Sequence, residues 1–183
     1  MGSIWQRPAS TANDGARRLH VMMPLHMTEY TIGMDLGGTN LRAAAIDRSG
    51  TLLEKVAGAT KFEDGREAVI ADIVAAISKL RETHGADGLR GIGVGVPGFI
   101  RMKEGLITNS NNLPYLENVP IRDVLSAKLD TRVILENDAN AAALGECWMG
   151  AGRDVDDLVL LTLGTGIGGG IISGGGHPTI RGG

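Results

Sequence analysis

Two glycine-rich segments carry the residues most suited to chemistry in this chain. The first is Asp35-Leu36-Gly37-Gly38-Thr39-Asn40, and the second is Leu163-Gly164-Thr165-Gly166-Ile167-Gly168-Gly169-Gly170. In the first, an acid and a hydroxyl stand beside bare backbone N–H groups, which suits a phosphate group with its metal ion. A hairpin tip with no chemical role explains the same residues equally well, because adjacent glycines supply the positive φ of a tight turn.

Asparagine and acidic side chains gather at two further places. Glu136-Asn137-Asp138 stands between a predicted strand and a predicted helix, where the simplest role of Asp138 is to cap the helix N-terminus. The segment 97–118 is rich in asparagine, whose side-chain amide both donates and accepts hydrogen bonds and therefore suits sugar hydroxyls. Turn formation accounts for these asparagines just as simply.

The spacing Gly93-x-Gly95-x-x-Gly98 matches the dinucleotide-binding fingerprint only formally. Pro97 lies inside it and no helical pattern opens after it, as that fingerprint requires. We therefore expect these glycines to let another backbone approach closely. No P-loop sequence occurs in the chain. Two glycine hairpins that face each other across a cleft could still bind a nucleoside triphosphate through backbone N–H groups and a metal ion.

Composition excludes several classes of function. The 183 residues carry a net charge of −3 and 3% aromatic residues, which gives neither a basic surface nor stacking platforms for nucleic acid. No apolar run is long enough to span a bilayer, so we expect no membrane partner. The one cysteine excludes an internal disulfide and fits a reducing compartment, which predicts a cytoplasmic protein.

Hydrophobic periodicity predicts an α/β domain that positions these residues. Residues 1–27 show no period of a strand or helix, so we predict a disordered tail there. After the tail we expect an antiparallel meander, a helix that leads to a parallel strand, an asparagine-rich loop, and then a helix, a strand, a second helix and a final hairpin. The predicted segments, in that order, are 30–36, 40–47, 51–57, 65–81, 89–96, 97–118, 121–129, 132–135, 139–148, 158–163 and 168–172.

Taken together and in order, these motifs resemble the ROK family of sugar kinases, specifically its glucokinase-like members. The resemblance runs from about Tyr30 to Ser173 and includes Gly33–Asn40, Gly93–Gly98, Asn112-Leu113, Glu136–Ala141 and Leu163–Gly170. It implies an actin-like ATPase fold with two ribonuclease H-like lobes. We expect residues 28–118 to form a complete first lobe and residues 119–183 to form part of the second.

The resemblance also implies roles for individual residues. Asp138 matches the general base, and Asp35 matches the acid that helps to hold Mg²⁺. The positions that match sugar-binding residues are Gly98, Asn112, Asn137 and Asp138. The positions that match the two phosphate-binding motifs for ATP are Asp35, Gly37, Gly38, Thr39 and Asn40, and then Gly164, Thr165, Gly166, Gly168 and Gly169. The implied reaction is phosphorylation of a hexose, with glucose favoured, and the family tends to form homodimers.

The family pattern fails after Ser173. Family members continue into a Glu-Gly-His segment and a cysteine-rich zinc motif, neither of which occurs here, so we expect no zinc site and give no role to His177. The final hairpin is expected to leave four apolar residues poorly covered: Leu160, Leu161, Ile171 and Ile172. Three hypotheses stay open: a sugar kinase that is truncated, a non-catalytic sugar-binding or regulatory module, and an inactive fragment with no stable fold.

Overall fold

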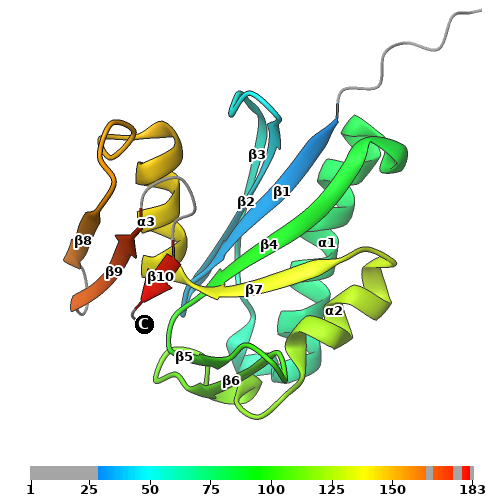
Figure 1. The fold of residues 1–183 in the computed structure, drawn as a ribbon. Coiled ribbons are helices and arrows are strands. Elements are labelled where there is room, and N and C mark those ends of the chain that lie inside the picture. Colours follow the sequence, from blue (N-terminus) through cyan, green and yellow to red (C-terminus); the bar gives the residue numbers. More distant parts are fainter. Residues whose placement is uncertain (1–28, 164–166, 175–178, 182–183) are drawn as a thin grey trace, which may run out of the picture.

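Five strands form the central sheet of the protein (Figure 1). The computed structural model describes residues 29–163, 167–174 and 179–181, so the expected tail 1–27 lies outside the described residues. The strands stand in the order β3-β2-β1-β4-β7. They are β1 (Tyr30–Leu36), β2 (Asn40–Asp47), β3 (Leu52–Ala59), β4 (Leu89–Val96) and β7 (Val133–Asn137).

Strand directions in this sheet confirm the predicted topology. β1, β2 and β3 form an antiparallel meander, while β4 runs parallel to β1 and β7 runs parallel to β4. Helix α1 (Arg66–His84) returns the chain between β3 and β4, as a parallel connection requires. The carboxyl ends of β1, β4 and β7 consequently meet at one edge of the sheet.

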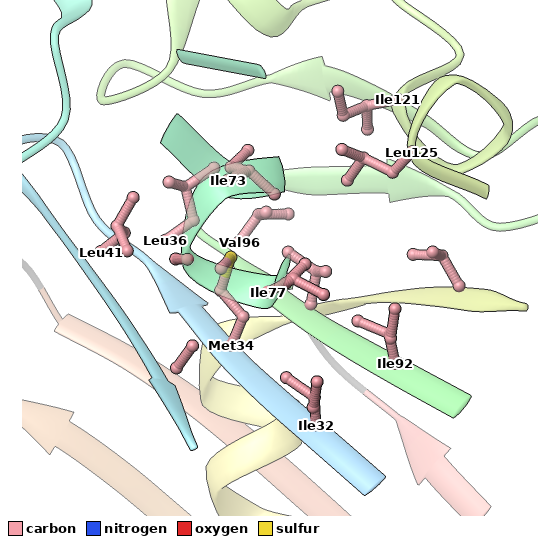
Figure 2. Close-up of a cluster of buried hydrophobic side chains, with 14 of the residues drawn as sticks. Ile32, Met34, Leu36, Leu41, Ile73, Ile77, Ile92, Val96, Ile121 and Leu125 are labelled. Atoms are coloured by element: carbon pink, nitrogen blue, oxygen red, sulfur yellow. The ribbon is translucent and has the colours of Figure 1, made fainter. Parts of the chain in front are cut away.

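Helices α1 and α2 (Ile121–Leu129) cover one face of the central sheet and form the hydrophobic core with it. Figure 2 shows side chains of α1 among those of the strands, with Ile73 and Ile77 close to Met34, Leu36 and Val96. The apolar residues of β1 recur at every second position and those of α1 at helical spacing, so each element presents one apolar face.

Helix α3 (Asp138–Met149) packs against a second, three-stranded sheet of order β10-β9-β8. These strands are β8 (Leu158–Leu163), β9 (Ile167–Ser173) and β10 (Thr179–Arg181). Gly170 makes the contact with α3 close, because a Cβ there would lie 2.7 Å from Cβ of Ala143 and 2.9 Å from the carbonyl oxygen of Ala139. A side chain at this position would push the helix off the sheet.

The expectation that four apolar residues of the last hairpin lie bare is only partly correct. Leu161 and Ile171 are exposed, and Leu160 is half-buried. Ile172 is buried at 1% exposure, because it points to the face of β9 that α3 covers. The prediction was wrong for Ile172 because sequence alone did not show which face α3 would take.

The expected loop 97–118 is not a plain loop. It contains the hairpin of β5 (Phe99–Arg101) and β6 (Leu106–Asn109), and a 3-10 turn at Pro114–Leu116. Gly105 has a φ of +68°, and its N–H donates to the carbonyl oxygen of Arg101 at 2.8 Å, which closes the hairpin. Strands of three and four residues are too short for their hydrophobic period to be recognised.

The boundary expected between residues 118 and 119 would separate α2 and β7 from the sheet on which they pack. β7 pairs with β4 along its whole length, and α2 contributes Ile121, Leu125 and Leu129 to the core. We therefore propose that the first lobe continues to Asn137 and that α3 begins the second. Among the described residues, no helix combines the length and apolar character needed to cross a bilayer.

Removal of one core side chain tests the packing of α1. Ile73 is fully buried, so Ile73→Ala should lower the free energy of unfolding by about 2–5 kcal/mol through lost apolar burial and a cavity. Urea denaturation followed by circular dichroism measures the change. Leu52→Ala is the control, because Leu52 is 46% exposed and its truncation should change stability little. An equal loss in both variants would contradict the assigned core.

Candidate active site

Asp35 and Asp138 lie at the same edge of the central sheet. Asp35 stands beside Gly95 in the register of β1 and β4, and Gly95 stands beside Glu136 in the register of β4 and β7. A Cβ on Gly95 would lie 3.6 Å from Cα of Asp138 and 3.5 Å from the carbonyl oxygen of Met34. Gly95 therefore lies directly beside the start of α3, but a Cβ there would make only ordinary van der Waals contact, so this position does not require glycine. Nothing lies within 4 Å of a Cβ on Gly93, so the close backbone approach expected of these glycines is absent at both positions.

The charges around Asp35 oppose one another. Partial burial raises the pKa of the Asp35 carboxyl, the Arg42 guanidinium lowers it, and the Asp138 carboxylate raises it again. The net result is a pKa above the ordinary value. Arg42 lies 3.8 Å from Asp35, and both side chains are more than half exposed, so this ion pair is weak. Asp35 and Asp138 thus place two carboxyl groups at one edge of the sheet, with the exposed Arg42 guanidinium beside Asp35.

Asn137, rather than Asp138, is the N-cap of α3. Its backbone is extended, and its Oδ1 accepts hydrogen bonds from the N–H groups of Ala139 at 3.0 Å and Asn140 at 3.1 Å. The expectation that Asp138 caps the helix is therefore wrong by one residue. Asp138 is the first residue of α3, its Oδ1 accepts from the N–H of Ala139 at 2.8 Å, and its side chain is exposed.

The same Asn137 side chain joins α3 to the segment after β4. Its Nδ2 donates to the carbonyl oxygen of Gly98 at 3.2 Å, and the residue is 8% exposed. Because Oδ1 is already shared by two helix N–H groups, Asn137 acts here mainly as a brace between β4 and α3. Its second Nδ2 hydrogen is the atom that remains for a ligand.

Gly98 is fixed by its backbone and by its neighbours. It has a φ of +113°, and a Cβ there would overlap the carbonyl oxygen of Asn109 and lie 2.8 Å from Cβ of Ser110. Only glycine fits where the segment after β4 crosses the end of β6. This close crossing positions the asparagine-rich loop next to the edge that carries Asp138.

The asparagine-rich loop also reaches the first glycine turn. A Cβ on Gly38 would lie 3.3 Å from Cβ of Asn112, so the predicted phosphate turn and the predicted sugar loop are neighbours. In the turn, Gly37 N–H donates to the carbonyl oxygen of Asn40 at 2.9 Å, and Asn40 Nδ2 donates to Thr39 Oγ1 at 3.0 Å. The expected positive φ is absent at Gly37 and Gly38, and of the two only Gly38 has a tight neighbour, Asn112.

The second glycine segment is described only in part. Gly164, Thr165 and Gly166 lie outside the described residues. Gly168 and Gly169 belong to β9, where a Cβ on Gly168 would lie 2.7 Å from Thr162 Oγ1 and 3.4 Å from Cβ of Ala139. These contacts assign Gly168 a packing role against β8 and α3, whereas its part in nucleotide binding stays a prediction.

The profile of the ROK family matches residues 31–183. This chain belongs to the ROK family. It is 44% identical over 142 residues to a glucokinase of Thermotoga maritima, and 38% identical over 149 residues to a beta-glucoside kinase of Listeria innocua. These matches cover 78% and 81% of this chain but 44% and 48% of those proteins. The chain therefore spans less than half the length of these ROK relatives.

Solved ROK structures share the fold. A ROK family glucokinase from Streptomyces griseus, in complex with glucose and AMPPNP, matches with a TM-score of 0.73 and 35% identity over 82% of this chain and 46% of that one. A ROK hexokinase from Thermus thermophilus matches with a TM-score of 0.72 and 37% identity, over 82% of this chain and 48% of that one. The predicted α/β, actin-like ATPase fold is thereby confirmed.

Two residues at this edge, Glu136 and Arg42, were given no site role from the sequence, and Gly95 was expected only to allow close backbone approach. Glu136 Oε1 accepts from the N–H of Asn137 at 2.9 Å and from Asn140 Nδ2 at 3.1 Å, which holds the corner between β7 and α3. Arg42 faces Asp35 across the first hairpin, and Gly95 lies between the two acids. Arg42 was predictable, because a hairpin that pairs Leu36 with Leu41 also pairs Asp35 with Arg42. Glu136 was not, since its partners depend on the tertiary bend.

Substitution of Gly98 tests the close crossing after β4. Gly98→Ala should lower the free energy of unfolding by about 2 kcal/mol or more, because it adds an unfavourable φ to a steric overlap with Asn109. Thermal unfolding measures the loss. Gly93→Ala is the matched control in the adjacent strand, where no atom lies within 4 Å of the new Cβ. Similar melting temperatures for the two variants would refute the crossing.

The pH dependence of thermal stability tests the pKa shift assigned to Asp35, with Asp47, whose pKa shifts in the opposite direction, as the control. Because the pKa of Asp35 is raised, its ionisation opposes folding, so Asp35→Asn should raise the melting temperature at pH 7. This gain should vanish below about pH 4, the ordinary pKa of an aspartate, where Asp35 is protonated in both states. The measurement is a series of thermal melts from pH 7 to pH 3.

Asp47 provides the control of opposite sign. Hydrogen bonds from Ser49 and Thr51 lower the pKa of Asp47, so its charged form favours folding. Asp47→Asn should therefore lower the melting temperature at pH 7, and the difference from the wild type should shrink as the pH falls below about 4. Changes of the same sign in both variants would contradict the electrostatics assigned to Asp35.

Proposed function

We propose that this protein binds a hexose and ATP and transfers the γ-phosphoryl group to a sugar hydroxyl, with glucose as the favoured hexose. The observation that carries the proposal is the convergence of four predicted features at one sheet edge: Asp35, the turn at Gly37–Thr39, Asn112 and Asp138. Phosphoryl transfer depends mainly on positioning and charge neutralisation, which such an edge can supply. Because ATP is its proposed co-substrate, we propose a cytoplasmic location.

Asp138 is the proposed general base. Its carboxylate is exposed, and the hydrogen bond from Ala139 N–H to Oδ1 orients it at the first turn of α3. A carboxylate within hydrogen-bond reach of the sugar hydroxyl can accept the proton as the oxygen attacks phosphorus. Glu136 and Asn137 support this role by fixing the bend between β7 and α3.

Asp35 is the proposed ligand of Mg²⁺. Its carboxylate is more than half exposed beside Asp138, so a cation can reach it, and a bound cation would favour the ionised form that partial burial disfavours. Mg²⁺ usually takes one or two carboxylates and completes its shell with waters and phosphate oxygens, so the described residues fit without a larger acidic cluster. When bound, the ion would neutralise charge on the transferring phosphate.

The proposed sugar contacts come from the loop that crosses beside Gly98. Asn112 is exposed next to the first glycine turn, and Asn137 retains one amide hydrogen for a hydroxyl.

The proposed phosphate contacts come from the two glycine segments. The first supplies Gly37, Gly38, Thr39 and Asn40, and the second supplies Gly164, Thr165, Gly166, Gly168 and Gly169. Gly37 N–H already closes its own turn, so the following N–H groups are the better candidates for phosphate oxygens. Backbone N–H groups of this kind bind anions without any basic side chain.

A second candidate function is sugar sensing without catalysis. A xylose repressor of Caldicellulosiruptor bescii is 34% identical over 143 residues, which cover 77% of this chain and 36% of that protein. The family thus includes a protein named for regulation, and a sugar site could serve that purpose without phosphoryl transfer. Hexose-dependent thermal stabilisation without ATP consumption would favour this candidate.

Asp138→Asn separates catalysis from binding. The variant should lower hexose-dependent ATP consumption by about 10²–10⁴-fold, because asparagine cannot accept the proton, while hexose-dependent thermal stabilisation stays close to that of the wild type. Coupled ATP-consumption and thermal-shift assays measure the two effects. Asp87→Asn is the control, because Asp87 is exposed in the turn Ala86–Gly88, away from the site.

Each outcome of these assays decides between the candidates. Near-normal turnover in Asp138→Asn would refute the base role. Sugar binding without turnover in the wild type would refute the kinase and favour the sensor. Neither binding nor a cooperative melting transition would refute both and favour an inactive fragment.

A further inference from the structure

A lysine follows closely after the strand that borders the first glycine turn. The ladder between β2 and β3 ends where Asn40 pairs with Ala59, and its last hydrogen bond runs from the N–H of Thr60 to the carbonyl oxygen of Thr39 at 3.1 Å. Thr39 belongs to the turn that we propose for phosphate. Lys61 is therefore joined directly to the residue whose backbone N–H holds that turn.

Strand alternation indicates that Lys61 projects from the side of the central sheet that carries Asp35. Asp35 pairs with Arg42 across one ladder and Arg42 pairs with Ala57 across the next, so these three residues point to the same side. Lys61 follows Ala57 by an even number of residues. Thr60 belongs to the opposite set, and its buried Oγ1 agrees with the side on which α1 packs.

The backbone of Lys61 is held in place, whereas its ammonium group has no partner in the described structure. The N–H of Lys61 donates to Asp72 Oδ2 of α1 at 3.0 Å, and its carbonyl oxygen accepts from the N–H of Asp64 at 3.1 Å. The next residue, Phe62, packs against the core. Lys61 is exposed, and its ammonium group forms no hydrogen bond or ion pair with the residues that the structure describes. A flexible stem on a fixed base can thus bring a positive charge to a nearby ligand.

The phosphates would lie at an edge that already carries negative charge. The carboxyl groups of Asp35 and Asp138 meet there, and the exposed guanidinium of Arg42 lies 3.8 Å from Asp35. A triphosphate brings several further negative charges, which stabilising contacts with cations must offset. An ammonium group without a partner in the described structure, on the same side of the sheet, is suited to this contact.

We propose that the ammonium group of Lys61 binds the phosphate chain of the substrate at the turn Gly37–Thr39. The contact would recognise any Mg²⁺-bound triphosphate chain, whether it belongs to a nucleoside triphosphate or to inorganic tripolyphosphate. A lysine acts here as a point charge on a flexible stem, so it needs no fixed hydrogen-bond geometry. This inference rests on the proposed function, because it takes the first glycine turn as the phosphate site.

Removal of the charge tests this contact. Isothermal titration calorimetry measures the binding of Mg²⁺-tripolyphosphate and of Mg²⁺-ATP to the 183-residue chain at low ionic strength. Lys61→Gln should weaken the binding of both probes by about fivefold or more, and added salt should narrow the difference from the wild type. Lys61→Arg keeps the charge and should retain most of the affinity. Because Lys61 is exposed, both variants should melt as the wild type does without ligand, and hexose-dependent stabilisation should not change.

Lys128→Gln is the matched control, because it changes the net charge equally. Lys128 is exposed in the last turn of α2, which leads to the start of β7 at the opposite edge of the sheet. Equal weakening in Lys128→Gln, or unchanged affinity in Lys61→Gln, would overturn the inference and leave the proposed function intact. A loss confined to ATP would also overturn it, since Lys61 would then contact the nucleoside. A wild type that binds neither probe would overturn both the inference and the proposed function.

Discussion

The first turn of α3 is held from three sides, and the candidate site is placed relative to it. Asn137 Oδ1 fixes the start of the helix, and Asn137 Nδ2 ties it to Gly98. Gly170 allows this turn to approach β9 closely. One amide and one glycine thus hold the helix between the two sheets. Asp138 receives its position from this arrangement rather than from contacts of its own.

Electrostatics at the same edge explains why two acids can serve different purposes. Burial contributes most to the raised pKa of Asp35, the solvent-exposed Arg42 guanidinium lowers it, and the Asp138 carboxylate raises it least. Asp138 instead stands at a helix start, where a backbone N–H orients it. The geometry therefore separates the proposed metal ligand from the proposed base while keeping both on one edge.

The first two strands of each sheet form a similar antiparallel pair, but the two pairs carry different side chains at equivalent positions. Each opens with an antiparallel pair of strands joined by a glycine-rich sequence, and the register that pairs Asp35 with Arg42 corresponds to the one that pairs Thr162 with Gly168. At equivalent positions the first hairpin carries an acid and the second a hydroxyl. One face of each hairpin is apolar, but α1 covers only the first. The repeat thus preserves the packing pattern and changes the chemistry.

The sequence by itself determined the elements: the periods of β1, β4 and α1 predicted their type and nearly their ends, and the ordered motifs predicted the family. Tertiary structure alone decided which residue caps α3, which face of β9 buries Ile172, and that Glu136 braces the bend. The physical reason is the separation in sequence between the residues that interact. Periodicity reports local backbone preference and one apolar face, whereas caps, braces and covered faces depend on segments that meet only after the chain has folded.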